Sequence, residues 1–159
     1  MTNPTGLPYT PVVRAGDWVI VSGQIGLAGV AGPVTSPDGA VADASVADGR
    51  IAVRVRCGEP LDEVVLRSYC TGAAHMALGW VTSEGLAVDA DGTVHDLTIR
   101  SFGIVRAADT PLIDIDIEPD TGPPVNGSDA VFAAVAAAVW VARGCPTDLP
   151  DTVRGRRGG

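Results

Sequence analysis

Two short segments alternate strictly between apolar and polar residues, and this pattern limits the fold more than any other feature of the chain. Residues 50–56 (RIAVRVR) place three aliphatic side chains on one side of an extended strand and three arginines on the other. Residues 111–120 (PLIDIDIEPD) place three isoleucines on one side and three carboxylates on the other. Alternation with a period of two is typical of a strand that is buried on one face. The segments predict a sheet with a solvated face, although the arginines could hold an anion and the carboxylates could bind a cation or move protons.

Helical periodicity separates these two strands and follows the second one. Residues 61–83 carry an apolar stripe with helical spacing. The stripe consists of Leu61, Val64, Val65, Ala73, Met76, Ala77 and Trp80. Gly72 weakens a helix, so we expect a short turn and a main helix that starts near Thr71. A last helix is predicted from Asp129 to about Arg143, where a glycine and then a proline follow.

The other segments are expected to add strands and loops. Residues 12–27 read as two strands around a turn, and residues 86–102 read as a hairpin around an Asp-Gly pair. Residues 28–49 are rich in Gly, Pro, Ala, Ser and Asp, which predicts a long loop that could include one short strand or helix.

The order of these elements predicts a single α+β domain. A mixed or antiparallel sheet carries two main helices on one face, over residues 1–150. Residues 28–49 form a loop-rich insertion in this domain, and residues 151–159 form a flexible tail. The sheet face without helices needs cover, which favours a homo-oligomer.

Composition excludes several classes of function. The formal net charge of −8 argues against nonspecific binding to nucleic acid. The chain has no lysine, which excludes a lysine Schiff base and a P-loop lysine. Its three cysteines form no CxxC pair, so we expect neither a disulfide framework nor a structural zinc site. No signal peptide is evident, and the apolar run 130–142 is too short to span a bilayer. We expect a cytoplasmic protein with a small-molecule substrate and no nucleic acid or membrane partner.

The segment GLPYTPVVRAGDWVIVSGQIGL, residues 6–27, resembles the opening of the RidA/YjgF family of trimeric imine deaminases. That family continues with a long helix, where this chain has a Gly- and Pro-rich segment. Its catalytic arginine lies just before a late strand. The resemblance therefore implies that Arg106, which precedes PLIDIDIE, contacts the substrate.

A second resemblance covers about residues 47–150. It is carried by CGEPLDEVVLRSYCTGAAHMALGW (57–80), VTSEGLAVDADGTVHDLTIRSFGIVRAADTPLIDIDIE (81–118) and GPPVNGSDAVFAAVAAAVW (122–140). The order and spacing of these segments resemble the C-terminal part of the molybdenum-binding subunit of xanthine dehydrogenase and aldehyde oxidase. Most of that family's large molybdenum domain has no counterpart here. The resemblance therefore implies a molybdopterin cofactor only within a larger complex.

The residues that serve the metal in that family are altered in this chain. In the family a Gly-Glu pair carries the catalytic base beside the molybdenum, but here Gly127 is followed by Ser128. A hydroxyl cannot replace a carboxylate base unaided. Asp129 is adjacent, but helix geometry directs it about 100° away. The cofactor-contacting turn is also altered, to SYCTGA at 68–73. We therefore expect a relative without a cofactor of its own.

His75 is the first candidate for acid–base catalysis. It lies one turn into the helix expected from Thr71, and Gly72 and Gly79 clear space beside its ring. A histidine in this place could move a proton near neutral pH. A structural histidine with a satisfied hydrogen bond fits the same pattern.

The turn formed by Tyr69, Cys70, Thr71 and Gly72 is expected to meet a helix N-terminus. Free N–H groups there favour an oxyanion, so we expect residues 70–72 to contact the substrate. Tyr69 could donate its hydroxyl to a developing oxyanion, and Cys70 could be a reactive thiolate. A packed tyrosine and a buried, inert thiol are the alternatives.

A second turn, formed by Asn126, Gly127, Ser128 and Asp129, opens the last helix. These residues could act only as caps. If the ancestral pocket persists, they face the same cavity as residues 69–75. Ser128 and Asp129 then take part in catalysis, and Asn126 and Gly127 bind the substrate.

Four functions remain open. The favoured one is a metal-free enzyme that cyclises, isomerises or hydrates a small organic substrate by acid–base chemistry. The second is a fragment subunit of a split molybdenum hydroxylase. The others are a RidA-like hydrolase of enamines or imines and a noncatalytic binding or assembly protein.

Overall fold

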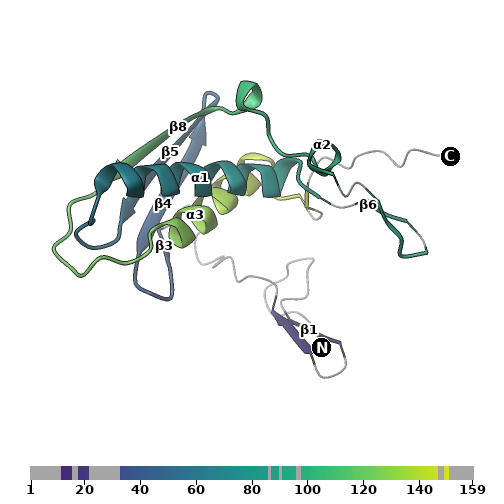
Figure 1. Ribbon diagram of the computed structural model, residues 1–159, viewed down its shortest axis with the longest axis horizontal. Helices are drawn as coiled ribbons and strands as arrows, with labels where there is room; N and C mark the ends of the chain where they lie inside the picture. The colour runs from purple at the N-terminus through teal and green to yellow at the C-terminus, as the bar shows by residue number, and fades with distance from the viewer. Residues whose placement is uncertain are drawn as a thin grey trace.

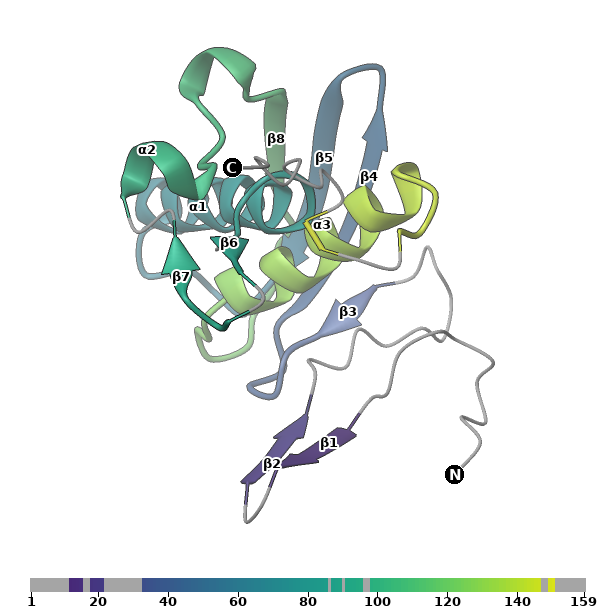
Figure 2. The ribbon, with the colours of Figure 1, turned by 90° about the vertical axis from the view of Figure 1, so that its right-hand side faces the viewer.

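The fold is built on a four-stranded sheet that two helices cover on one face (Figures 1 and 2). The structure is a computed structural model, which describes residues 12–15, 18–21, 33–85, 87–89, 91–95, 98–146 and 149–150. In spatial order, the strands are β3 (Val34–Thr35), β4 (Val41–Ala47), β5 (Arg50–Arg56) and β8 (Leu112–Ile117). The helices are α1 (Glu63–Thr82) and α3 (Ser128–Ala142). The predicted α+β class is confirmed.

Shorter elements complete the described part of the chain. They are β1 (Val12–Ala15), β2 (Trp18–Val21), β6 (Ala87–Val88), β7 (Val94–His95), the helical turn α2 (Ile99–Phe102) and the 3₁₀ turn η1 (Ala107–Asp109). The pairs β1–β2 and β6–β7 are antiparallel, as predicted for both segments, but the end of the predicted 86–102 hairpin is helical. The predicted tail at 151–159 and most of the RidA-like segment lie outside the described residues.

The sheet is mixed because its two types of connection differ. β3, β4 and β5 are joined as antiparallel neighbours, whereas β5 and β8 are parallel and need the crossover that contains α1. Asp48 and Gly49, both at positive φ, make the two-residue turn between β4 and β5. α3 packs mainly over β4, and α1 packs against α3 and β8.

The alternating strands bury the faces that the sequence predicts. On β5, Ile51, Val53 and Val55 are buried beneath the helices, and Ile115 on β8 is buried beside them. The opposite face carries ion pairs between Arg50 and Asp114 at 2.5 Å and between Arg54 and Asp43 at 2.7 Å. This face is charged and internally paired. A homo-oligomer that covers this face therefore stays a prediction.

Strand β4 lies inside the segment that was expected to be a long loop. Its small side chains are poor strand formers in isolation, which is why composition predicts a loop. Ala42 is buried, and Ala44 and Val46 are partly buried against the core beneath α3. Small residues are needed there because α3 approaches this strand closely. Tertiary packing overrides the intrinsic preference of the segment.

Helix α1 is continuous, so the expected start near Thr71 is wrong. It begins at Glu63, where the Asp62 carboxylate accepts the N–H groups of Val64 and Val65 at 2.9 and 3.0 Å. Gly72 lies in the middle of the helix without breaking it. Among the described residues, no helix is long and apolar enough to cross a membrane.

The face that α1 buries also differs from the predicted stripe. Small residues, namely Cys70, Ala73, Ala74, Ala77, Gly79 and Val81, face the core. Several large members of the predicted stripe, including Val65, Met76 and Trp80, are exposed instead. A helix that packs tightly against both a sheet and another helix has no space for large side chains on its inner face.

The turn after β5 depends on Gly58. This residue has φ of +78°, and a Cβ on it would overlap the carbonyl of Pro123. Gly49, in the β4–β5 turn, has φ of +71°, but a Cβ on it would meet nothing within 4 Å. An alanine at position 49 would therefore introduce backbone strain alone, whereas an alanine at position 58 would introduce both strain and steric overlap.

We predict that Gly58→Ala lowers the free energy of unfolding by about 3 kcal/mol, whereas Gly49→Ala lowers it by only about 1 kcal/mol. An L side chain at positive φ costs roughly 1–2 kcal/mol, and at Gly58 the segment carrying Pro123 must also move. Urea denaturation of both variants and the wild type measures the difference. Equal losses in the two variants would contradict the close contact at Pro123.

Candidate functional site

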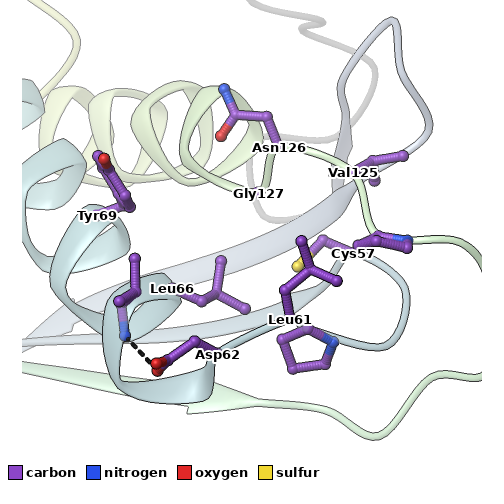
Figure 3. Close-up of a pocket in the computed structure, with 11 residues that line it drawn as sticks. Cys57, Leu61, Asp62, Leu66, Tyr69, Val125, Asn126 and Gly127 are labelled. Atoms are coloured by element: carbon purple, nitrogen blue, oxygen red, sulfur yellow. Dashed lines mark hydrogen bonds between the residues drawn. The ribbon is translucent and has the colours of Figure 1, made fainter.

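A shallow pocket of about 330 Å³ lies between the N-terminal half of α1 and the segment that leads into α3 (Figure 3). Most of its wall is apolar. It is lined by Cys57, Pro60, Leu61, Asp62, Val65, Leu66, Tyr69, Pro124, Val125, Asn126 and Gly127. The sequence predicts a pocket between residues 69–75 and the turn at 126–129. Of these residues, Tyr69, Asn126 and Gly127 line the pocket described here, whereas residues 70–75, Ser128 and Asp129 do not.

Close backbone contact brings the two walls of the pocket together. The N–H of Val125 donates to the carbonyl of Cys57 at 2.9 Å. A Cβ on Gly127 would lie 3.1 Å from the Cys57 Sγ and 3.2 Å from Val55, so only glycine fits there without a shift. Gly127 therefore has a packing role at the entrance to α3.

Asp120 fixes the same segment from its other end. Its carboxylate accepts the N–H groups of Gly122 and Gly58, each at 3.1 Å. These hydrogen bonds lower the pKa of the Asp120 carboxyl. Sequence analysis did not single out this residue. The signal for it was an Asp followed two residues later by Gly, which is typical of a side chain that bonds its own turn.

The polar residues at the start of α3 bond to one another. The Asn126 Oδ1 accepts the backbone N–H of Ser128 at 3.0 Å and its hydroxyl at 2.6 Å. The Asn126 amide also donates to the Asp129 carboxylate at 3.4 Å. Asn126 lines the pocket, but Ser128 and Asp129 do not. Their proposed catalytic roles stay predictions, and in this conformation their bonds support the helix start.

The predicted oxyanion site at residues 69–72 depended on a helix N-terminus that does not exist. These residues lie inside α1, where backbone N–H groups are used in the helix. The Thr71 hydroxyl donates to the carbonyl of Arg67 at 2.8 Å, one turn earlier. Tyr69 is exposed at the pocket rim, where its hydroxyl remains available to a ligand (Figure 3).

Cys70 is fully buried, unlike a reactive thiol. Burial raises the pKa of this thiol to about 11. Cys57 is also buried, and burial raises its pKa as well. Neither thiol forms an appreciable thiolate near neutral pH, whereas Cys145 is exposed.

His75 lies away from the pocket, on the C-terminal half of α1. Its Nε2 is 3.1 Å from the carbonyl of Val105, so it donates a hydrogen bond there as the Nε2–H tautomer. The space beside its ring at Gly79 is filled by Glu84, because a Cβ on Gly79 would overlap that carboxylate. Burial raises the pKa of the Glu84 carboxyl, and His75 acts in the opposite direction. Sequence analysis recognised the space at Gly79 but not the carboxylate that occupies it.

Arg106 also lies outside the pocket. Its Nε donates to the Asp109 carboxylate at 2.6 Å across η1, on the exposed surface. It lines a second, open recess at the other end of α1, together with Ser83 and Arg143. The structure therefore brings Tyr69, Asn126 and Gly127 together, but it places His75 and Arg106 elsewhere.

The pocket does not fit the molybdopterin that the sequence resemblance implies. A phosphate-bearing cofactor is normally held by cations or free N–H groups. Among the described residues of the lining, Asp62 is the only charged one, and it already accepts the N–H groups at the start of α1. No group of three His, Cys, Asp or Glu side chains among the described residues is arranged to hold a metal ion. These residues could face a substrate, but they cannot hold the cofactor.

Comparisons with known proteins show the fold. No protein-family model and no curated protein sequence matches the chain. It is similar in structure to quinoline 2-oxidoreductase from Pseudomonas putida 86, with a TM-score of 0.50 and 20% identity, over 64% of this chain and 14% of that chain. It is also similar to the Cu,Mo-CO dehydrogenase, with a TM-score of 0.46 and 15% identity, over 63% of this chain and 14% of that chain. Reconstituted CO dehydrogenase from Oligotropha carboxidovorans matches with a TM-score of 0.46 and 15% identity, over 67% of this chain and 14% of that chain.

Quinoline 2-oxidoreductase is a molybdenum hydroxylase, so the resemblance to that family is confirmed at the level of fold alone. The chain spans 14% of the length of quinoline 2-oxidoreductase. The RidA resemblance of residues 6–27 stays a prediction.

We predict that a thiol reagent at pH 8 modifies Cys145 rapidly and leaves Cys70 unmodified until the protein unfolds. With a pKa of about 11, roughly one Cys70 thiol in a thousand is ionised at pH 8. Folding raises the pKa of Cys70, so its neutral thiol stabilises the folded state fully at pH values below the unfolded-state pKa of about 8.5. This contribution to stability is lost as the pH rises toward 11. Mass spectrometry after timed alkylation identifies the modified residue, and Cys145→Ser serves as the control. Rapid labelling of Cys70 in the folded protein would contradict its burial.

Proposed function

We propose that this chain is a subunit of a molybdenum hydroxylase-type enzyme that is divided among several chains. It contributes one apolar wall of the substrate site, and another chain holds the molybdenum cofactor. The observation that carries this proposal is the composition of the pocket between α1 and α3. Its wall is mainly apolar, and the described residues that line it include no cationic side chain for the cofactor.

The polar groups of the pocket support this division of roles. Asp62 caps α1 through its Oδ1, and the Asn126 Oδ1 accepts the N–H and the hydroxyl of Ser128. Tyr69 and Asn126 stand at the rim, where they can orient a substrate by hydrogen bonds. Leu61, Val65 and Leu66 supply apolar contact area for a flat organic molecule. Binding and orientation are the tasks that this wall can perform.

The first prediction is that the native protein co-purifies with a larger chain and with molybdenum. Native mass spectrometry and elemental analysis of the same sample measure both.

Within the assembled enzyme, Leu61→Arg should raise KM about tenfold or more while kcat changes little, because it places a charge at the mouth of an apolar pocket. Ile99→Arg, at a similarly exposed apolar residue outside this pocket, is the matched control. A metal-free homo-oligomer as the only native species would refute the proposal.

A second candidate function is metal-free acid–base conversion of a small organic substrate at His75. The observation that favours it is the carboxyl of Glu84, which lies over Gly79, one helical turn from His75. Burial holds the pKa of this carboxyl above its usual range. A carboxyl beside a histidine is an arrangement that can pass protons to and from a substrate.

If this second function is correct, His75→Ala should lower turnover by roughly 10²–10⁴-fold. The change also removes the hydrogen bond to Val105, so a structural control is needed. Ser83→Ala removes a comparable bond, from the Ser83 hydroxyl to the carbonyl of Gly103 at 2.6 Å, without removing a proton-transfer group. Steady-state kinetics of both variants measure the effect. Similar, few-fold losses in the two variants would show that His75 is structural.

A further inference from the structure

Helix α1 carries an apolar stripe that the described residues leave about half exposed, although Trp80 at one end also packs against Phe132 of α3, with ring centroids 5.8 Å apart. The stripe is formed by Val65, Tyr69, Gly72, Met76 and Trp80, which are spaced by four, three, four and four residues along one line of the helix. The exposed fractions are 49% for Val65, 67% for Tyr69, 54% for Met76 and 43% for Trp80. Figure 1 shows α1 in front of the sheet and α3, on the outside of the helix layer. Large apolar side chains gathered on one exposed line mark a contact surface.

No charge interrupts this surface. Residues 68–83 contain no Asp, Glu, Lys or Arg, although the chain carries a net charge of −8. The charged residues of α1, Glu63 and Arg67, pair with each other at 2.8 Å, and Arg67 also donates to the carbonyl of Ile115 in β8. They are therefore directed toward the sheet edge. A second acidic copy can approach the stripe without bringing like charges together along it.

No contact among the described residues requires glycine at position 72. A Cβ on it would meet nothing within 4 Å, whereas Gly58, Gly79 and Gly127 are each required by close contacts. Glycine in the middle of a helix is unfavourable relative to alanine. A close crossing with another helix explains the residue, because the missing side chain lets the two backbones approach.

We infer that a second copy of this chain docks on the stripe, with the two α1 helices antiparallel and crossing at Gly72. A twofold interface must be self-complementary. Tyr69 and Met76 lie equally far from the point between Gly72 and Ala73, and so do Val65 and Trp80. Antiparallel pairing about this point places Tyr69 against Met76 of the second copy and Val65 against Trp80 of the second copy. Each large side chain of the stripe thereby gains an apolar partner.

The available area matches what a specific dimer needs. The exposed parts of the stripe and of Leu61, one turn before Val65 on the same line, amount to roughly 700 Å² per copy, close to the about 800 Å² per partner of a standard interface. Val65 and Tyr69 also line the pocket, so Trp80 of the second copy covers its open side. This last consequence rests on the proposed function, but the pairing of the helices does not.

Sedimentation equilibrium of the full chain tests the pairing. We expect a wild-type dimer whose dissociation constant rises about 100-fold or more in Gly72→Glu, because two carboxylates meet near the twofold axis. Thr71→Glu adds the same charge to the neighbouring exposed residue, off the stripe, and should change the constant less than about threefold. Circular dichroism confirms that each variant is folded.

A charge-swap pair tests the register. Tyr69→Arg and Met76→Glu should each weaken the dimer by a similar factor. The double variant should recover most of the loss, because the two new charges meet twice across the interface. A double variant that is as weak as the single ones would overturn the antiparallel register.

The outcome is separable from that of the proposed function when the samples are also analysed for molybdenum and larger chains. A monomeric wild type, or a dimer that Gly72→Glu leaves intact, overturns the inference whatever co-purifies. A larger chain that Gly72→Glu releases from an otherwise monomeric protein assigns the stripe to that chain, which overturns the second copy but leaves the proposed function standing. A dimer sensitive to Gly72→Glu, without any larger chain or molybdenum, supports the inference and refutes the proposed function.

Discussion

The close approach of two helices to one face of the sheet determines most of this structure. It depends on small side chains, because large ones would hold the layers apart. Ala42 on β4, Ala74 and Ala77 on α1, and Ala134 and Ala136 on α3 are almost fully buried in the contact. The arrangement has a second effect. Since the inner face of α1 has little space for large residues, several large apolar side chains of that helix, including Tyr69 and Met76, lie on its outer face.

The same close packing forms the pocket at one end of the helix layer. Gly127 lets the start of α3 touch the end of β5, and Gly58 lets the following turn lie against the segment around Pro123. The two backbone segments are then joined by hydrogen bonds, including those of the Asp120 carboxylate. The resulting wall is rigid and mainly apolar, and its polar groups are largely engaged in maintaining it. Its chemistry suits binding and orientation more than bond breaking.

Several parts of the fold were accessible from sequence because they depend on local patterns. Strict alternation identified the buried faces of β5 and β8, and a glycine followed by a proline marked the end of α3. Strand β4 was expected only as one short strand or helix within a long loop, although Asp48 and Gly49 form a turn of the type that joins two strands. The segment is rich in Ala, Ser and Asp, and this composition favours a loop over a strand. Intrinsic propensity does not include the packing of α3 against the strand, which is what stabilises β4.

The sequence by itself determined the α+β class, the alternation of the sheet and the nature of the polar groups available near the pocket. Only the tertiary structure decided which face of α1 is buried, where that helix begins and which candidate residues meet. A hydrophobic stripe indicates that a helix face avoids water, but it does not say whether that face meets its own sheet or another surface. That choice depends on the distance between layers, which is set by side chains far apart in the sequence. For the same reason His75 and Tyr69, six residues apart on one helix, lie at different places on the molecule, one bonded to Val105 and the other at the pocket rim.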